Sequence, residues 1–281
     1  MNTTFNAEKQ NALAERFHAL HHAETMLVLP NAWDCLSAKI FEESGFPAIA
    51  TTSSGISWSV GYKDGEHIPP ELMLEVIRRI TNAVSIPVTA DIEAGYFGND
   101  FERYGKFISD VIEAGAVGVN IEDADAKTKT LNDLDKQKSK ITLAKNIGKE
   151  KGVRLFVNAR TDAYERAPGE LKNKIHACIE RADAYQRAGA DGIFIPFILE
   201  METIAELKKA ISLPLNILVN EKLDIGELRK LHVNRVTVGG KPIVAAMSLL
   251  KKISGELQSG NNWQSLFVKE PTYLEINSWF Q

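Results

Sequence analysis

Short runs of apolar residues recur along the chain, and a polar segment and a longer segment with helical spacing follow most of them. Short apolar runs rich in Val, Ile, Leu and Phe are typical of buried strands, and apolar positions three and four apart are typical of helices that cover a sheet. The predicted strands are 26–30, 48–53, 87–91, 118–123, 155–161, 192–196, 215–220 and 235–240. Predicted helices between them include 70–83, 101–114, 171–188 and 204–211.

Alternation of strands and helices predicts right-handed βαβ units and a parallel sheet. The stretches EAGAVGVNIE and RAGADGIFIP repeat one transition, in which a helix ends on Ala-Gly and leads into a buried strand. An open doubly wound sheet would carry a glycine-rich turn after its first strand, and the stretch NAWDCLS that follows 26–30 contains no glycine. We therefore expect an α/β protein in which the units close into a (β/α)₈ TIM barrel.

Both ends of the chain extend beyond these units. Residues 1–24 place Phe5, Leu13, Phe17 and Leu20 near helical spacing, which predicts an amphipathic covering helix and not a signal peptide. Residues 253–281 exceed what the barrel needs and are rich in aromatic residues. We expect this extension to pack on a neighbouring element or on another subunit, and the whole of 1–281 to form one barrel domain.

Composition narrows the classes of partner. The 281 residues carry a net charge of −4 and are 44% hydrophobic, as in ordinary globular proteins. Basic residues form no stripe, which argues against nucleic acid, and no apolar run is long enough for a membrane span. Cys35 and Cys178 have no metal-ligand spacing, so we expect a reduced, cytoplasmic protein.

Polar side chains gather where the predicted strands end. The carboxyl ends of the strands meet at one mouth of a parallel barrel, where active sites of this fold lie, and every second residue points to the same side. The residues at or just after these ends include Thr52, Ser53, Ser54, Asp91, Glu93, Asn120, Glu122, Asp123, Asn158, Arg160, Asp162 and Gly239. We expect those on the inward side to share one cavity.

Three of these acids form the candidate metal site. Asp91, Glu93 and Glu122 would repel one another at a common mouth, and a hard divalent cation removes that repulsion. Mg²⁺ prefers oxygen ligands, keeps several waters and binds one or two carboxylates directly, with Mn²⁺ as the alternative ion. Each acid alone could instead cap a helix or pair with an arginine, and that structural role is the interpretation for Asp123 and Asp162.

Other polar groups at the mouth suit an anionic substrate. The fork of Arg160 can bind a carboxylate or phosphonate through two hydrogen bonds, and an ion pair of Arg160 with Glu122 or Asp162 is compatible with that role. The hydroxyls of Thr52–Ser54 could hold another anionic group or form a plain turn, and Gly239 resembles a barrel phosphate site. The predicted lids are the SVGYKDGEH loop, which carries Asp64, and the segment ADAKTKTLNDLDKQKSK.

Several stretches together resemble the isocitrate lyase/phosphoenolpyruvate mutase superfamily over nearly the full chain. They are LVLPNAWDCLSAKIFEESGFPAI, the TTSSG and GYKDG segments, ADIEAGYFGN, GAVGVNIEDA, VNARTDAY, AGADGIFIP and RVTVGG. The resemblance implies a (β/α)₈ barrel whose eighth helix is swapped between subunits of a homo-oligomer, a dimer or a dimer of dimers (tetramer). It also implies Mg²⁺ and an α-oxo-acid or enolpyruvate substrate.

The resemblance assigns roles by position. Asp91 matches the direct metal ligand, while Glu93 and Glu122 would reach the ion through water. Glu93 stands where the family commonly has an aspartate, so its reach is longer by one methylene. Arg160 matches the substrate-binding arginine, and Asp64 matches the loop aspartate near the reacting centre.

Two departures from the family pattern bear on the substrate. Ser53 replaces the glycine of the family's Ser-Gly-Leu or Ser-Gly-Gly loop, which binds the substrate carboxylate through the positions of Thr52, Ser53 and Ser54. Isocitrate and methylisocitrate lyases carry Lys-Lys/Arg-Cys-Gly-His after the glutamate that Glu122 matches, whereas this chain has ADAKTKTLND, without Cys or His. This difference disfavours those lyases and favours the mutase, phosphonopyruvate hydrolase, oxaloacetate hydrolase or decarboxylase branches, or an uncharacterised lyase.

The sequence thus predicts a Mg²⁺-dependent enzyme that cleaves or forms a C–C bond next to the carbonyl of a small α-oxo carboxylate, through a metal-stabilised enolate. Arg160, the Thr52–Ser54 loop, Asn120 and Gly239 would bind substrate, and Asp64 would place water or act as a base. One alternative is phosphoenolpyruvate mutase or phosphonopyruvate hydrolase activity on a P–C bond. The other is a non-catalytic oxo-acid-binding paralogue, because the fold does not fix the function.

Overall fold

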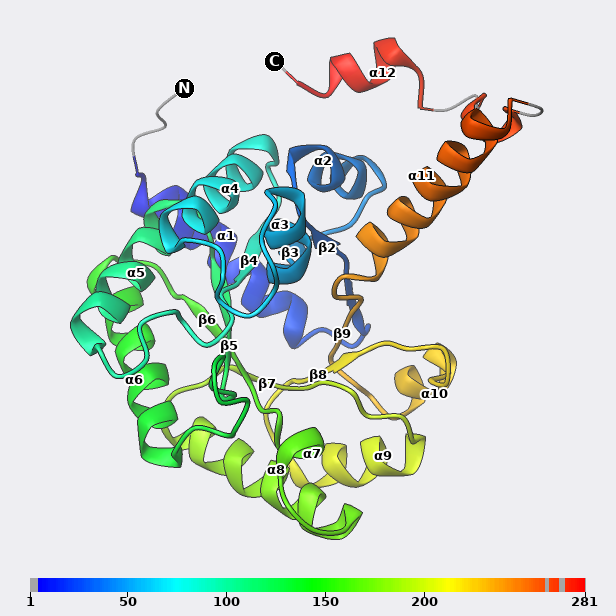
Figure 1. Ribbon diagram of the computed structural model, residues 1–281. Helices are drawn as coiled ribbons and strands as arrows, with labels where there is room; N and C mark the ends of the chain where they lie inside the picture. The colour runs from blue at the N-terminus through cyan, green and yellow to red at the C-terminus, as the bar shows by residue number, and fades with distance from the viewer. Residues whose placement is uncertain (1–4, 261–262, 268–270, 281) are drawn as a thin grey trace. The chain divides into compact units, whose positions relative to one another are not determined.

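The computed structural model describes residues 5–260, 263–267 and 271–280. The chain forms two compact units, Met1–Val238 and Gly239–Gln281. In the first unit, nine short parallel strands form one sheet with the order β1-β9-β8-β7-β6-β5-β4-β3-β2, and helices lie around its outside (Figure 1). The strands are β1 (Leu27–Leu29), β2 (Asn31–Ala32), β3 (Ile49–Thr51), β4 (Val88–Asp91), β5 (Gly118–Glu122), β6 (Phe156–Arg160), β7 (Gly192–Ile195), β8 (Leu215–Leu218) and β9 (Arg235–Thr237). The predicted (β/α)₈ barrel is confirmed, because β1 and β2 are successive parts of one strand and the sheet returns on itself.

The break in the first strand lies at Pro30, which has no N–H to donate to the ladder. Pro30 still accepts a bond from Ala50, and the side chain of Asn31 continues the pairing on both sides. Its Nδ2 donates to the Thr51 carbonyl at 2.9 Å, and its Oδ1 accepts from the Val238 backbone N–H at 3.0 Å. The Asn31 side chain therefore adds one bond to each neighbouring strand beside the break in the first strand.

The helices of the first unit follow the predicted pattern. They are α1 (Ala7–His21), α2 (Cys35–Glu43), α3 (Ser53–Ser59), α4 (Pro70–Ala83), α5 (Phe101–Glu113), α6 (Leu134–Glu150), α7 (Ala163–Arg166), α8 (Leu171–Arg187), α9 (Met201–Ala210) and α10 (Ile225–Lys230). In α4, a proline occupies the first turn, where its missing N–H costs nothing, and Met73, Ile77 and Ile80 bury one face. This helix matches its predicted bounds.

The predicted N-terminal covering helix is α1, which contacts β6. Phe17 packs edge-on against Phe156, the first residue of β6, and His21 stacks on the same ring with centroids 4.0 Å apart. Because Phe156 lies at the amino end of its strand, α1 covers the end of the barrel opposite the predicted mouth. Residues 1–4 of the predicted segment lie outside the described residues.

The second unit contains α11 (Lys241–Ser259), a short 3₁₀ turn (Gln264–Leu266) and α12 (Tyr273–Ser278). It exposes large apolar side chains, among them Leu250, Phe267 and Leu274. The swapped helix and the oligomer remain predictions, and residues 261–262, 268–270 and 281 of the extension lie outside the described residues.

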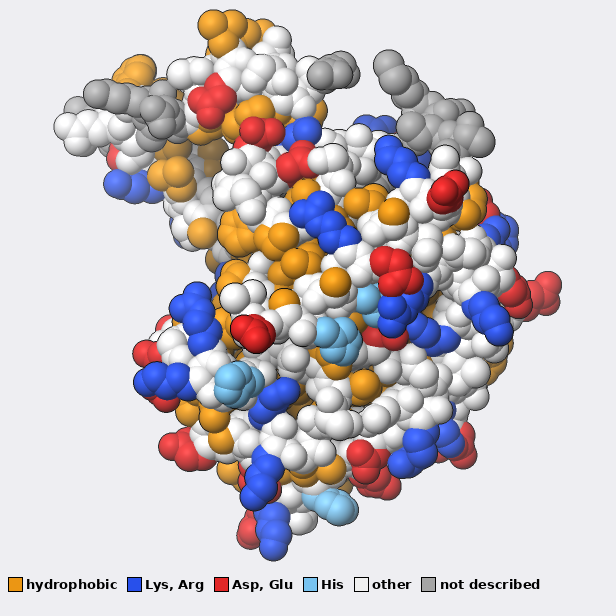
Figure 2. All heavy atoms as spheres, turned by 180° about the vertical axis from the view of Figure 1, so that it is seen from behind, with side chains coloured by type: hydrophobic (Ala, Val, Ile, Leu, Met, Phe, Trp, Pro, Cys, Tyr) orange, Lys and Arg blue, Asp and Glu red, His pale blue; other side chains and the backbone are white. Residues whose placement is uncertain are grey.

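The described surface bears on the predicted partners. Acidic and basic side chains are interspersed over the face drawn in Figure 2. Within the part of the chain that the structure describes, no helix combines the length and the apolar character of a bilayer span.

Candidate active site

Asp91 lies at the carboxyl end of β4 and is held by the start of α3. The N–H and the hydroxyl of Ser53 both donate to Asp91 Oδ2, at 3.1 and 2.8 Å. The backbone N–H of Asp91 donates to Thr51 Oγ1 at 2.9 Å, which joins β4 to the end of β3. Neither bond from Ser53 involves Asp91 Oδ1, so one carboxylate oxygen is fixed by the protein and the other is available to a ligand.

Glu93 sits in a strained turn directly after β4. Its backbone has φ +53°, a left-handed conformation that is uncommon for a non-glycine residue, and its side chain is buried. Its Oε2 accepts from the Glu66 backbone N–H at 2.6 Å, and its Oε1 accepts from the Tyr96 hydroxyl at 3.2 Å. A strained backbone persists only where surrounding bonds hold it, and such residues cluster at functional sites.

Arg160 connects the acids at the ends of two strands. Its Nη1 lies 2.7 Å from Glu122 Oε2, while Nε and Nη2 donate to the two oxygens of Asp162 at 2.7 and 3.1 Å. Glu122 and Arg160 are register partners in β5 and β6. A guanidinium carries five N–H donors, so two remain for a substrate.

The carboxylates influence one another strongly. Burial, followed by the charges of Asp64, Asp91 and Glu122, raises the pKa of Glu93 to about 8. Burial and neighbouring acids also raise the pKa of Glu122 to about 8, against the lowering effect of Arg160. The acids expected at the mouth therefore lie within electrostatic range of each other, where a cation would favour their ionised forms.

Asp64 lies on the exposed loop after β3. Desolvation, followed by the charge of Asp91, raises its pKa although the side chain remains accessible. A hollow of about 780 Å³ opens beside it, between the loops that follow β3, β4 and β5, and Tyr96 and Lys129 also line it. Asp64 is thus on the mouth side, as predicted for a loop acid.

One predicted lid is shorter than expected. Only residues 124–133 of the second segment form a loop, closed by a bridge between Ala124 and Leu131. From Leu134 onward the chain is α6, because Asp133 caps the helix by accepting N–H bonds from Asp135 and Lys136. The prediction of a lid over the whole segment is wrong in its second half.

Asp123 has the structural role that the sequence predicted. It is fully buried, and its Oδ2 accepts from Tyr185 Oη at 2.6 Å and from Arg181 Nη1 at 3.0 Å. Its Oδ1 accepts from the Asp162 backbone N–H at 2.9 Å. This network fixes Asp162, which in turn holds Arg160.

The predicted substrate-binding residues have different surroundings. Thr52 caps α3, and its hydroxyl lies 3.0 Å from that of Ser54. Asn120 Oδ1 accepts from Asn158 Nδ2 at 2.8 Å inside the barrel. Gly239 begins the second unit, so its role remains a prediction.

Three residues of the site were missed in the sequence. Glu66 and Tyr96 bind Glu93, and the Tyr96 backbone N–H donates to Glu66 Oε1 at 2.6 Å. Arg235 is fully buried at the start of β9. No spacing signal identifies them, because their partners come from other loops or strands.

The arrangement of oxygens suits a hard cation held partly through water. Among the described residues, no three His, Cys, Asp or Glu side chains are grouped closely enough to hold a metal directly. Asp91 has an oxygen that Ser53 does not use, and the carboxylates of the buried Glu93 and the half-buried Glu122 have raised pKa values. Mg²⁺, which keeps several of its waters, fits this donor set.

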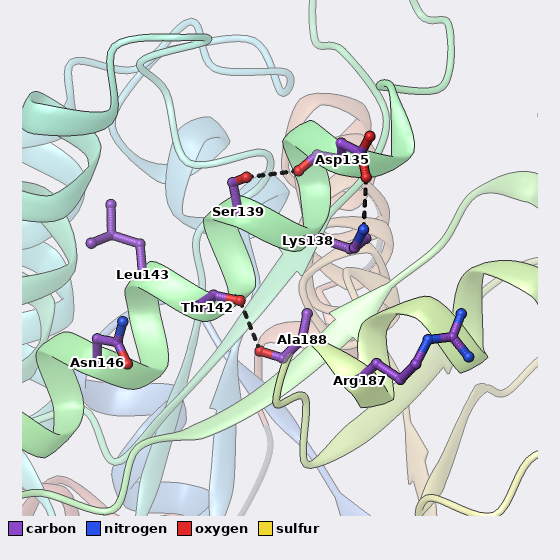
Figure 3. Close-up of a pocket in the computed structure, with 8 residues that line it drawn as sticks. All are labelled: Asp135, Lys138, Ser139, Thr142, Leu143, Asn146, Arg187 and Ala188. Atoms are coloured by element: carbon purple, nitrogen blue, oxygen red, sulfur yellow. Dashed lines mark hydrogen bonds and ion pairs between the residues drawn. The ribbon is translucent and has the colours of Figure 1, made fainter.

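A second hollow of about 570 Å³ lies away from the strand ends, between α6 and α8 (Figure 3). Its charged groups include the ion pair of Lys138 with Asp135 at 2.7 Å, and Thr142 Oγ1 donates to the Ala188 carbonyl at 3.1 Å. Because residues of the covering helices line it, away from the strand ends, it is a groove of the outer layer and not the site.

The family model described as phosphoenolpyruvate phosphomutase matches residues 17–258. The chain is 35% identical to "Uncharacterized protein Rv1998c" of Mycobacterium tuberculosis, over 82% of this chain and 84% of that protein. It is 28% identical to 2-methylisocitrate lyase of Halalkalibacterium halodurans, over 74% and 68%. It is 27% identical to oxaloacetate decarboxylase of Rhodopseudomonas palustris, over 82% and 80%.

Solved structures agree in fold. A protein of Burkholderia cenocepacia J2315, provisionally described as a phosphonomutase, is 35% identical with a TM-score of 0.83, over 90% of this chain and all of that one. Phosphonopyruvate hydrolase in complex with oxalate and Mg²⁺ is 24% identical with a TM-score of 0.83, over 95% and 94%. At that identity, the second likeness shows the fold alone.

Proposed function

Because the chain belongs to the phosphoenolpyruvate phosphomutase family, we propose that it is a Mg²⁺-dependent enzyme that breaks or forms a C–C bond next to the carbonyl of a small α-oxo carboxylate. The observation that carries the proposal is the convergence of Asp91, Glu93, Glu122 and Asp64 beside Arg160. Relatives named for lyase and decarboxylase activities support the substrate class.

Each residue has a part in this proposal. Asp91 would hold Mg²⁺ through Oδ1, and Glu93 and Glu122 would hold it through water. When bound, the ion supplies positive charge that stabilises an enolate as the bond breaks. Arg160 would bind the substrate carboxylate with its two remaining N–H groups.

The loops would complete the site. The hydroxyls of Thr52 and Ser54 would hold another anionic oxygen of the substrate, as would Asn120 and Gly239. Asp64 would approach the reacting carbon when its loop closes, and the raised pKa of its carboxyl suits a group that accepts a proton. Closure would exclude water from the site. A cytoplasmic homo-oligomer, a dimer or a dimer of dimers, remains part of the proposal.

A screen of α-oxo and 2-hydroxy acids, with and without Mg²⁺, tests the proposal. Release of pyruvate, glyoxylate or oxalate is expected only with the ion, and Asp91→Asn is expected to lose at least about 1,000-fold in kcat/KM. The control is Asp183→Asn on the outer surface of α8, which should retain full activity. Turnover that survives exhaustive chelation would contradict the proposal.

P–C chemistry is the second candidate, favoured by the family description. Release of phosphate from phosphonopyruvate, without cleavage of oxaloacetate, would establish it in place of C–C cleavage. Tight binding of oxo acids by calorimetry, without turnover of any of them, would instead establish a non-catalytic binding protein.

A further inference from the structure

Arg235 places a fully buried guanidinium inside the barrel. It is the first residue of β9, in register with Leu27 of β1 and Asn216 of β8. Its side chain has no exposed surface, and Nη2 makes one long contact, 3.5 Å, to Asn120 Oδ1. Asn120 is the register partner of Asp91. Arg235 therefore reaches the polar residues directly beside the candidate metal site.

Most of this guanidinium has no partner. Its Nε and Nη1 are buried without a hydrogen bond, and none of the ion pairs formed by described residues includes Arg235. Burying a charge without a partner is strongly unfavourable, and apolar side chains of similar size are often more stable in such places. A residue that weakens the fold in this way is expected to serve a function.

Asp91, the register partner of Asn120, is the acid whose charge acts on Arg235. Burial lowers the pKa of Arg235 to about 9, so it remains protonated at neutral pH, and Asp91 counteracts the lowering. Arg160 neutralises Glu122 at the mouth, but its bonds go to Glu122 and Asp162. Arg235 thus acts on Asp91 from inside the barrel, in addition to Arg160, whose charge also interacts with Asp91.

We infer that Arg235 is a positioning residue of the site: a buried cation that weakens the hold of Asp91 and its neighbouring acids on a divalent ion. The inference depends on the proposed function, in which Asp91 binds Mg²⁺. A second positive charge nearby repels the ion, and an ion held less tightly by carboxylates retains more charge for the substrate. Arg235 would thereby set the balance between metal affinity and catalysis.

A titration of the full-length, metal-free protein with Mn²⁺, monitored by electron paramagnetic resonance, tests this inference. Arg235→Met, which removes the charge and keeps the bulk, is expected to bind Mn²⁺ about tenfold more tightly than the wild type. Arg235→Lys, which keeps the charge, is expected to stay within about threefold of it. The matched control is Thr89→Val, which removes a buried hydroxyl without a partner from β4 but no charge, and should leave Mn²⁺ affinity unchanged.

Thermal unfolding and kinetics complete the test. Without metal, the melting temperature of Arg235→Met is expected to be at least about 3 °C above that of the wild type. At saturating Mg²⁺, the substitution is expected to reduce kcat by a larger factor than it changes KM. If the Met variant does not fold, Arg235→Gln carries the same comparison. Unchanged or weaker Mn²⁺ binding by the uncharged variants overturns the inference and leaves the proposed function standing. A wild-type chain that binds no Mn²⁺ overturns both.

Discussion

Ser53 holds Asp91 through two donors, its N–H at 3.1 Å and its hydroxyl at 2.8 Å, on the same carboxylate oxygen. This relationship links the first residue of α3 to the last residue of β4. Two bonds to one oxygen restrain the position of Oδ2 and leave Oδ1 free of Ser53. Ser53 therefore orients the proposed metal ligand.

The first prediction concerns this contact. Ser53→Ala is expected to weaken Mg²⁺ binding about tenfold, because Asp91 loses the hydrogen bond from the Ser53 hydroxyl to Oδ2 that orients its carboxylate. Calorimetric titration with MgCl₂ measures the change. Ser59→Ala is the control, since the Ser59 hydroxyl donates to the Ile56 carbonyl within α3 and not to Asp91. Equal affinity in wild type and Ser53→Ala would show that the hydroxyl does not orient Asp91.

The second prediction concerns Arg160. Arg160→Lys keeps the positive charge but loses the fork that bonds both oxygens of Asp162 and reaches Glu122. Binding of oxalate in the presence of Mg²⁺ is expected to weaken at least about tenfold. Loss of these bonds should also lower the free energy of unfolding by about 1–3 kcal/mol.

Arg166→Lys is the control for this substitution. Arg166 also contacts Asp162, at 3.3 Å, but lies in α7. Oxalate titrations of both variants in the same buffer give the comparison. An equal loss of affinity in both would mean that Arg160 acts only by supporting Asp162.

The third prediction is a pH dependence from Lys140. Its ammonium is buried in α6 and donates to the Ala94 carbonyl at 2.6 Å, next to the strained Glu93. Burial lowers its pKa in the folded protein to about 8 from 10.5. Below pH 8 both states are protonated, so the penalty for burying the charge is fully present.

Between these two pKa values the unfolded chain binds more protons, so this group makes stability rise with pH. The contribution is at most about 1.4 kcal/mol per pH unit. Urea unfolding at pH 7.5, 8.5 and 9.5 should show that the free energy of unfolding of the wild type, relative to that of Lys140→Met, increases with pH. A difference that stays constant with pH would contradict the assignment.

The fourth prediction compares two glycines in the loop after Glu93. Gly95 has φ +90°, and a Cβ there would lie 2.5 Å from the ring of Tyr104, whereas Gly98 has φ +57° and open space around it. Gly95→Ala is expected to cost about 2–4 kcal/mol, from a backbone conformation unfavourable to alanine and an overpacked core. Gly98→Ala should cost only about 1 kcal/mol, from the backbone alone. Urea unfolding measures both, and equal costs would show that the contact with Tyr104 relaxes.

The barrel was predictable because burial imposes local patterns. Strands buried on both faces must be apolar along their length, as in residues 192–195, and helices that cover them must repeat at helical spacing, as in α4. Each predicted strand contains an observed one, and the differences lie at the ends. The exception is Pro30, where the absence of one N–H divides the first strand.

The candidate site was predictable only in part. Alternation along a strand, together with parallel pairing, is enough to place Asp91, Glu122 and Arg160 on one side. This spacing does not predict which acid forms an ion pair with Arg160. In the structure Arg160 pairs with both Glu122 and Asp162. The second half of the predicted lid is part of α6, because its polar residues also suit an exposed helix face.

The sequence by itself determined the order of strands and helices and the set of polar groups at the strand ends, because these depend on local spacing and burial. Only the tertiary structure decided which groups meet: Ser53 with Asp91, Tyr96 with Glu93, and Arg235 with Asn120. Those contacts join residues brought together by closure of the barrel or by a strained turn. Hydrogen-bond geometry depends on distances of a few tenths of an ångström, which the packing of the whole barrel sets and no local pattern encodes.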